Sequence, residues 1–263
     1  MFCARAGAAE VVGVDRSEVI YDAMDIVREN GLSDVVKLVK GRLEEMVLPG
    51  GRDRRFDVIV SEWMGYFLLF EGMLDSVLYA RDHLLADGGT LMPNRCTMSL
   101  VAVSDMERYD HLLSFWSDVY GFRMSCLRAE VLQGGQCGGG AGCRHLLRPL
   151  PDQAARPQHD HCGRHRVHGA VLGACDARVP RNGAGRLLFD THFDLPIAVG
   201  FSTGPQAPST HWKQTVFYLE QPVSADAGDT IDGTLFCGRD RKDPRSLRVT
   251  LTTGGRSQSY RVS

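Results

Sequence analysis

Apolar, β-branched runs alternate with helical segments through the first part of the chain, and this alternation limits the fold more than any other feature. EVVGVD at 10–15, VVKLV at 35–39 and FDVIVS at 56–61 predict strands, the last of a kind typical of parallel sheets buried on both faces. Apolar residues at helical spacing predict helices at 17–30 and 72–85. Strands that alternate with helices favour a doubly wound α/β sheet.

The pattern changes after Pro93, where strand signals replace the alternation. TMSLVAVS at 97–104 predicts a strand, and residues 107–128 predict a helix. Nearer the C-terminus the strand candidates are IAVGFST, WKQTVFYLE, DTIDGTLFC and SLRVTLT. We therefore predict an α/β domain at 1–92 and a β domain at 93–263.

The segment 134–186 fits neither half. It contains GGQCGGGAGC and RPLPDQAARPQHDHCGRHRVHG, and it has no Lys, Glu, Phe, Tyr, Trp, Ile, Met, Ser or Thr. Such a composition buries little core, so we expect the segment to be poorly ordered. Its abrupt loss of β-forming residues is typical of an out-of-frame reading of a GC-rich gene, with the frame restored near FDTHFD.

The same segment holds several possible metal ligands. They are Cys137, Cys143, His145, His159, His161, Cys162, His165 and His168. Strong zinc sites use paired short spacings such as two cysteines separated by two residues. His161 and His165 have helical spacing, but Gly163 lies between them, and no pair of cysteines matches the pattern. We predict no metal site here.

The bulk properties exclude several classes of partner. A net charge of −2 gives no signature of polyanion binding, so we expect no direct contact with nucleic acid. No apolar run approaches membrane-spanning length, so we expect no membrane association. The N-terminus is not expected to be a secretory signal, because Arg5, Glu10 and Asp15 interrupt it. The eight cysteines have no framework spacing and are expected to be reduced thiols in the cytoplasm or the nucleus.

Asp15 stands at the end of a predicted strand. Ligands of open α/β sheets bind outside the carboxyl ends of the strands, and an acid there commonly binds ribose hydroxyls. Asp15 could equally cap the helix that starts near Ser17. The sequence alone leaves both interpretations open.

The stretch SEWMGYFLLFE at 61–71 places two carboxylates, Glu62 and Glu71, at the ends of an aromatic and aliphatic run. We expect residues 66–70 to desolvate both acids, which would then require a cation. A guanidinium is the best match, because its planar fork binds carboxylates bidentately. The alternatives are an arginine of the chain itself or two acids on the surface.

Four motifs resemble one known family. SEWMGYFLLFEGMLDSVLYAR is similar to the double-E loop of the protein arginine N-methyltransferases, GVDRSEV and KGRLEEMVLP resemble its cofactor motifs, and THWKQTVF resembles its threonine-histidine-tryptophan loop. The similarity covers 1–132 and roughly 187–263. It implies a Rossmann-like S-adenosylmethionine-dependent methyltransferase domain followed by a β-barrel domain, with a helical dimerisation arm at about 107–132.

The resemblance also implies roles for single residues in cofactor binding. Asp15 would hold the ribose of S-adenosylmethionine, and Leu43 and Glu44 would contact its adenine. Glu44 lies in the string KGRLEEMVLP.

On the substrate side, the resemblance implies that Glu62 and Glu71 bind the guanidinium of a protein arginine and that His211 orients the site. Without the resemblance, His211 beside a tryptophan would be interpreted as a packed core residue. The remaining substrate-positioning roles fall to Met64, Tyr66, Met73 and Trp212. Met73 matches the methionine associated with asymmetric dimethylation, which indicates the type I subclass.

The implied activity is methyl transfer to protein arginine, giving mono- and asymmetric dimethylarginine. The implied substrates are arginine-containing proteins, often Gly-Arg-rich, including ribosomal or RNA-binding proteins. The implied assembly is a homodimer, located in the cytoplasm and also in the nucleus.

The chain also departs from the family. Family members begin with helices that cover the cofactor, then a strand and a Gly-rich loop, whereas this chain starts at MFCARAGA and has no Gly-x-Gly sequence within 1–92. We therefore expect an N-terminally truncated, incomplete cofactor domain and no activity from these 263 residues alone. The alternative is a non-catalytic fragment that acts only through protein–protein contacts.

Overall fold

A computed structural model describes most of the chain and divides it into two compact units. The described residues are 1–104, 106–134, 136–138, 144–145, 147–149, 156–159, 165–175, 183–194, 199–220, 223 and 229–263. The first unit is Met1–Ser61 with Leu74–Met92, and the second is Glu62–Met73 with Pro93–Ser263. The two units are described separately.

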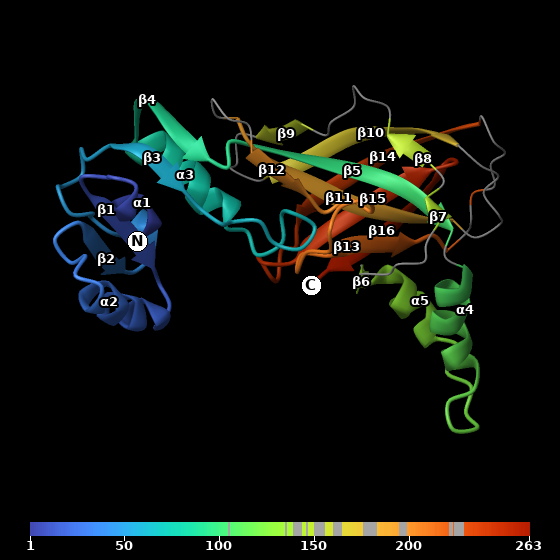
Figure 1. Ribbon diagram of the computed structural model, residues 1–263. Helices are drawn as coiled ribbons and strands as arrows, with labels where there is room; N and C mark the ends of the chain where they lie inside the picture. Colours follow the sequence, from blue (N-terminus) through green and yellow to red (C-terminus); the bar gives the residue numbers. More distant parts are fainter. Residues whose placement is uncertain are drawn as a thin grey trace. The chain divides into compact units, whose positions relative to one another are not determined.

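The first unit begins with a parallel strand pair joined by a helix (Figure 1). β1 (Val11–Asp15) pairs with β2 (Val36–Lys40) over their full lengths, and α2 (Val19–Glu29) connects them. α2 buries Ile20 and Val27, which lie on one face at helical spacing. Two short elements complete this part, α1 (Phe2–Arg5) and the 3₁₀ helix η1 (Leu43–Glu45).

A second parallel pair follows in the same unit. β3 (Phe56–Val60) pairs with β4 (Leu85–Met92), and α3 (Leu74–Leu84) precedes β4 directly. Among the described strands, β1 pairs only with β2 and β3 only with β4, so the predicted sheet is present as two separate pairs. The edge of β3 is open, and the side chains of Val58 and Val60 are exposed.

The second unit contains two antiparallel sheets of six strands (Figure 1). The first has the order β16-β15-β14-β10-β8, with β9 also paired to β10. Its strands are β8 (Leu147–Pro149), β9 (Arg156–His159), β10 (His165–Cys175), β14 (Thr230–Arg239), β15 (Leu247–Thr253) and β16 (Arg256–Val262). In β15 the buried Leu247, Val249 and Leu251 alternate with more exposed residues, as the period-2 pattern of SLRVTLT predicts.

The other sheet has the order β6-β13-β11-β5-β7, with β12 paired to β11. Its strands are β5 (Arg95–Ser104), β6 (Gln136–Gly138), β7 (Arg144–His145), β11 (Gly183–Phe193), β12 (Val199–Ser202) and β13 (Gln214–Tyr218). In β13, Val216, Phe217 and Tyr218 are almost fully covered.

Parts of the segment 134–186 are described as strands of the second unit. β10 pairs with β14 from Val167–Cys237 to Ala174–Thr230, and with β8 and β9 on its other side. A strand ladder is made by backbone groups, so it forms even where β-forming side chains are few. The expectation that the segment is poorly ordered stays a prediction.

The arm is two helices rather than the single helix predicted for 107–128. α4 (Met106–Ser114) continues into the 3₁₀ helix η2 (Phe115–Ser117), and α5 (Leu127–Gln133) follows after a turn. In that turn Val119 and Phe122 exchange backbone hydrogen bonds of 2.8 and 3.0 Å. Tyr120 and Gly121 between them have φ of 53° and 87°, the left-handed conformation of a tight two-residue turn.

The arm packs on the second unit through a small apolar core. Leu113 of α4 and Leu132 of α5 share one buried cluster with Val103, Val216 and Tyr218. Beyond this cluster the turn of the arm leaves Tyr120 97% and Phe122 68% exposed. In the described part of the chain, no helix has the length and apolarity needed to cross a membrane.

Candidate active site

The loop Glu62–Met73, here called the acidic loop, connects β3 to α3 but belongs to the second unit. It folds back on itself, because the Gly65 N–H donates to the Leu68 carbonyl at 3.0 Å and Phe67 and Leu68 both have left-handed φ, 55° and 60°. A β-carbon at Gly65 would lie 2.2 Å from the carbonyl oxygen of Phe70. Only glycine fits there, so this fold of the loop is built into the sequence.

The apolar side chains of the acidic loop are packed inside the second unit. Phe67 is 2% exposed, and its ring meets Phe217 of β13 edge to face, with centroids 5.6 Å apart. Trp63, Met64 and Leu68 are also buried. Edge-to-face aromatic pairs stabilise beyond their buried area, so Phe67 is the principal anchor of the loop.

The two carboxylates point to solvent instead. Glu62 and Glu71 are both exposed, and the Glu71 side chain is 52% accessible. The expectation that residues 66–70 desolvate both acids is therefore wrong. The reason is the left-handed backbone at Phe67 and Leu68, which accompanies burial of the apolar side chains and leaves the acids outside.

Glu71 has a guanidinium partner within the chain. Arg245 Nη2 lies 3.1 Å from Glu71 Oε1, so the alternative of an internal arginine partner is realised for this acid. The Glu71 N–H also donates to the Arg245 carbonyl at 3.1 Å, and Glu71 has φ of 75°, rare for a residue other than glycine. The next carbonyl, that of Gly72, accepts from Arg239 Nη2 at 3.2 Å.

Glu62 stands at the other end of the loop. Within the described part of the chain its carboxylate makes no hydrogen bond or ion pair. Tyr66 and Met73, two of the predicted positioning residues, are 39% and 46% exposed. The loop therefore offers one carboxylate without a described partner, one carboxylate paired with Arg245, and the accessible side chains of Tyr66 and Met73.

The predicted threonine-histidine-tryptophan loop contacts the acidic loop through Trp212. Its Nε1–H donates to the carbonyl of Met64 at 2.6 Å, and its ring stacks on Phe201 with centroids 4.9 Å apart. His211 is exposed, and its ring lies 3.9 Å from the Trp212 ring. The structure thus brings Trp212 and Met64 together and places His211 beside them.

Replacing Trp212 by phenylalanine should remove this link while keeping an aromatic ring. Met64 is 7% exposed, so its carbonyl would lose its donor in a buried position. We expect the free energy of unfolding to fall by about 1–3 kcal/mol, measured by urea unfolding. His211→Ala, at the neighbouring exposed position, should change it by less than about 0.5 kcal/mol. Equal effects of the two changes would contradict the anchoring role of Trp212.

Asp15 lies where a ribose-binding acid is expected. It is the last residue of β1, opposite Lys40 at the end of β2, so it stands at the carboxyl edge of this strand pair. Its Oδ1 accepts from the Ser17 N–H and the Ser17 hydroxyl, both at 2.7 Å, and these bonds hold the pKa of Asp15 below its ordinary value. α2 begins at Val19 without a side-chain cap, so Asp15 caps the turn at Ser17 and not the helix itself.

Leu43 and Glu44 follow β2 in η1 at the same edge. The Ser76 hydroxyl of α3 donates to Glu44 Oε1. Burial raises the pKa of Glu44, but the hydrogen bond from Ser76 and the backbone N–H of Glu44 outweigh it and bring the pKa below its usual value. Leu43 is half-buried and presents an apolar side chain in the same element.

The side chains of the predicted metal-ligand candidates in 134–186 lie outside the part of the chain that the structure describes. Cys143, His161 and Cys162 lie outside the described residues, and so do the side chains of the remaining five. Where side chains are described, no group of three or more His, Cys, Asp or Glu is placed to hold a metal ion.

Four residues of these sites had no signal in the sequence. They are Ser76, Phe217, Arg239 and Arg245. Ser76 and Arg245 each contact a predicted site residue, while Phe217 and Arg239 contact other residues of the acidic loop. All four lie far along the chain from the residues they contact, so only the tertiary structure reveals them.

Comparison with known proteins decides the family. The chain is 38% identical over 277 residues to protein arginine N-methyltransferase 1.1 of Arabidopsis thaliana, an alignment that covers 100% of this chain and 67% of the relative. The chain belongs to the protein arginine N-methyltransferase family. It is also 36% identical to protein arginine N-methyltransferase 1 of Saccharomyces cerevisiae, over 96% of this chain and 72% of that protein.

The arginine methyltransferase assignment extends to the fold. The model of the arginine methyltransferase oligomerization subdomain matches residues 183–258. The Trypanosoma brucei PRMT1 enzyme–prozyme heterotetrameric complex with AdoHcy has a chain that superimposes with a TM-score of 0.86 at 29% identity, covering 100% of this chain and 84% of that one. The predicted fold class, a Rossmann-like domain followed by a β-barrel domain, is confirmed.

Proposed function

We propose that the protein transfers methyl groups from S-adenosylmethionine to guanidinium nitrogens of protein arginines. The observation behind this proposal is the acidic loop, which exposes two carboxylates and holds a guanidinium, that of Arg245, on one of them. Family membership supports the same chemistry. A carboxylate that binds one guanidinium in this setting has the chemistry to bind another.

The cofactor fits the residues at the edge of β1 and β2. Asp15 Oδ2 lies outside the two Ser17 hydrogen bonds, and an exposed carboxylate suits a ribose diol. The Glu44 carboxylate is a hydrogen-bond acceptor, and the Leu43 side chain provides apolar surface. An adenine requires both. When bound, S-adenosylmethionine supplies an electrophilic methyl group on a sulfonium. In the proposed mechanism these three residues bind and orient its adenosine end.

In the proposed mechanism the acidic loop binds and polarises the guanidinium of the substrate arginine. Arginine has a pKa above 12, so its guanidinium arrives protonated and has no free electron pair to attack with. Glu62 and Glu71 would draw the positive charge toward the two nitrogens that they bind, which leaves the third nitrogen more electron-rich. The proton lost on methylation would pass to Glu71. The left-handed backbone at Glu71 and the hydrogen bond from its N–H to the Arg245 carbonyl set the position of this acid before substrate arrives, which lowers the cost of orienting the substrate.

The direct test is a methylation assay with the full-length protein that the gene encodes, labelled S-adenosylmethionine and a Gly-Arg-rich peptide. Transfer of label to arginine is expected, and no transfer to any arginine-containing peptide would contradict the proposal. The second candidate, a non-catalytic chain acting through protein contacts, is favoured by the exposed Tyr120 and Phe122. Calorimetry with S-adenosylmethionine separates the two candidates, because only an enzyme needs the cofactor.

We further propose the type I subclass, with asymmetric dimethylarginine as the final product. Met73 at the end of the acidic loop supports this assignment by resemblance, and its side chain is accessible. Mass spectrometry of peptides after extended reaction should show mono- and asymmetric dimethylarginine. Symmetric dimethylarginine as the main product would show that the subclass is wrong.

The proposed partners are arginine-containing proteins, often Gly-Arg-rich, including ribosomal or RNA-binding proteins, and a second copy of the chain bound through the arm. The match of 183–258 to an oligomerization subdomain supports self-association. We place the protein in the cytoplasm and also in the nucleus. Four cysteines whose side chains are described, Cys3, Cys96, Cys126 and Cys237, are free thiols, which supports a reducing compartment. Fractionation of cells that express a tagged protein tests this location.

Two observations bear on which member of the family the chain is most similar to, and they differ. The strings SLVAVSD, FWSDVYGFRMSC, FSTGPQ, THWKQTVF and KDPRSL resemble protein arginine N-methyltransferase 3. The two curated relatives compared above are instead members named 1.1 and 1. We therefore propose a type I enzyme without assigning a member number.

A further inference from the structure

The acidic loop holds a guanidinium before any substrate is present. We propose that Arg245 is an internal competitor for the substrate arginine, one that occupies Glu71 in the free protein and is displaced when substrate binds. Arg245 would then set substrate affinity without taking part in the chemistry. The inference rests on the proposed function, since it assigns a role to Arg245 in that same site.

The Arg245–Glu71 pair can be displaced. The side chains are 63% and 52% exposed, and a single nitrogen–oxygen contact of 3.1 Å joins them. Exposed ion pairs with one contact are weak, because water screens them and two long side chains must be held in place. A substrate guanidinium that binds Glu71 bidentately forms the stronger pair and should replace Arg245.

Release of the Arg245 side chain would leave the acidic loop in place. The Glu71 N–H is held by the backbone carbonyl of Arg245, a bond that does not involve the guanidinium. Arg239 holds the carbonyl of Gly72, and Phe67 remains packed on Phe217. The side chain of Arg245 is therefore not needed to keep the left-handed conformation of Glu71.

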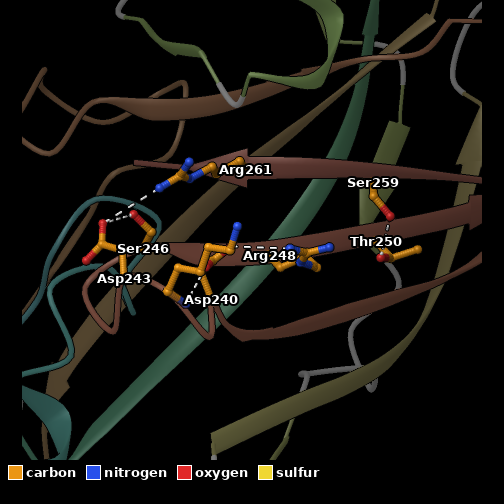
Figure 2. A network of polar contacts seen from close by, with 8 residues as sticks. Asp240, Asp243, Ser246, Arg248, Thr250, Ser259 and Arg261 are labelled. Atoms are coloured by element: carbon orange, nitrogen blue, oxygen red, sulfur yellow. Dashed lines mark hydrogen bonds and ion pairs between the residues drawn. The ribbon is translucent and has the colours of Figure 1, made fainter. Parts of the chain in front are cut away.

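The turn that presents Arg245 is itself built by hydrogen bonds. Asp243 Oδ1 accepts from the backbone N–H of Arg245 at 3.1 Å. Asp243 Oδ2 accepts from the hydroxyl of the buried Ser246 (Figure 2). The Ser246 carbonyl accepts from the N–H of Asp240 at 2.9 Å. This network fixes the backbone of Arg245 and leaves its guanidinium to Glu71.

The neighbouring acids already have arginine partners of their own. Arg248 Nη2 lies 3.3 Å from Asp240 Oδ2, and Arg261 Nη2 lies 3.9 Å from Asp243 Oδ2 (Figure 2). Arg248 is 64% exposed, almost the same as Arg245, yet it pairs with Asp240 and not with Glu71. It is therefore a matched control for the charge and exposure of Arg245.

The test uses steady-state methylation of a Gly-Arg-rich peptide by the full-length protein. Arg245→Ala should lower KM by about two- to fivefold and leave kcat within about twofold, the range expected from removing a weak exposed pair. Arg245→Lys keeps a cation without the planar fork and should give a KM between those of Arg245→Ala and the parent. Arg248→Ala should leave both constants unchanged.

The second readout is the affinity for a fluorescent arginine peptide, measured by fluorescence anisotropy without cofactor. In Arg245→Ala this affinity should rise by the same factor by which KM falls. An unchanged or raised KM in Arg245→Ala, with an active parent, overturns the competitor role alone. A fall in kcat of more than about tenfold also overturns it, because Arg245 would then position Glu71 for catalysis. A parent that binds the peptide but never methylates it overturns the proposed function, while anisotropy still decides the role of Arg245. A parent that does neither overturns both.

Discussion

Glu62→Gln should reduce methylation by about 10² or more, the largest catalytic effect that we expect from any single change in this chain. Glutamine keeps the shape of the side chain but removes the charge that would draw the guanidinium charge to one side. Glu62 is exposed and makes no described contact, so the change should not disturb folding. The measurement is kcat/KM for a Gly-Arg-rich peptide with the full-length protein.

Glu29→Gln is the matched control for this prediction. Glu29 is an exposed glutamate at the end of α2, and its loss should leave kcat/KM within about twofold. Circular dichroism of both variants should match that of the parent. Activity of Glu62→Gln within a few-fold of the parent would exclude the acidic loop as the guanidinium site.

Phe67→Ala should lower the free energy of unfolding of the second unit by about 3–5 kcal/mol, as for other buried aromatic truncations. Phe67 is 2% exposed and loses both its buried area and its edge-to-face contact with Phe217. Urea unfolding followed by tryptophan fluorescence measures the change. Activity should also fall, because the acidic loop loses its principal anchor.

The neighbouring Tyr66 tests whether this effect comes from burial. Tyr66 is 39% exposed and lies in the same loop, so Tyr66→Ala should lower the free energy of unfolding by less than about 1 kcal/mol. A similar loss of stability in both variants would mean that any change in the loop destabilises the protein, and that Phe67 has no special role.

The sequence predicted strands well where their own residues are apolar and β-branched. FDVIVS at 56–61 became β3 at Phe56–Val60, and SLRVTLT became β15 at Leu247–Thr253. It missed β4 at Leu85–Met92, because Gly88 and Gly89 interrupt its apolar pattern and indicate a turn. A local sequence pattern predicts a strand only when the residues of that strand are themselves apolar.

The candidate site was found by a partly wrong argument. The sequence singled out Glu62 and Glu71 through the aromatic run between them, but those rings are turned into the protein and both acids are exposed. A left-handed backbone at Phe67 cannot be predicted from composition, since it depends on the partner at Phe217. Arg245 was missed for the same reason, because it lies 174 residues from Glu71.

This long separation bears on how the protein is made. The acidic loop leaves the ribosome well before its partners, because Trp212, Arg239 and Arg245 lie 148, 167 and 174 residues after the loop residues that they contact. The loop therefore cannot take its final conformation until the chain has been synthesised past Arg245. A premature stop before Trp212 would leave both carboxylates in the product and still remove every one of these contacts, so a nascent or shortened chain would contain the catalytic acids without a site.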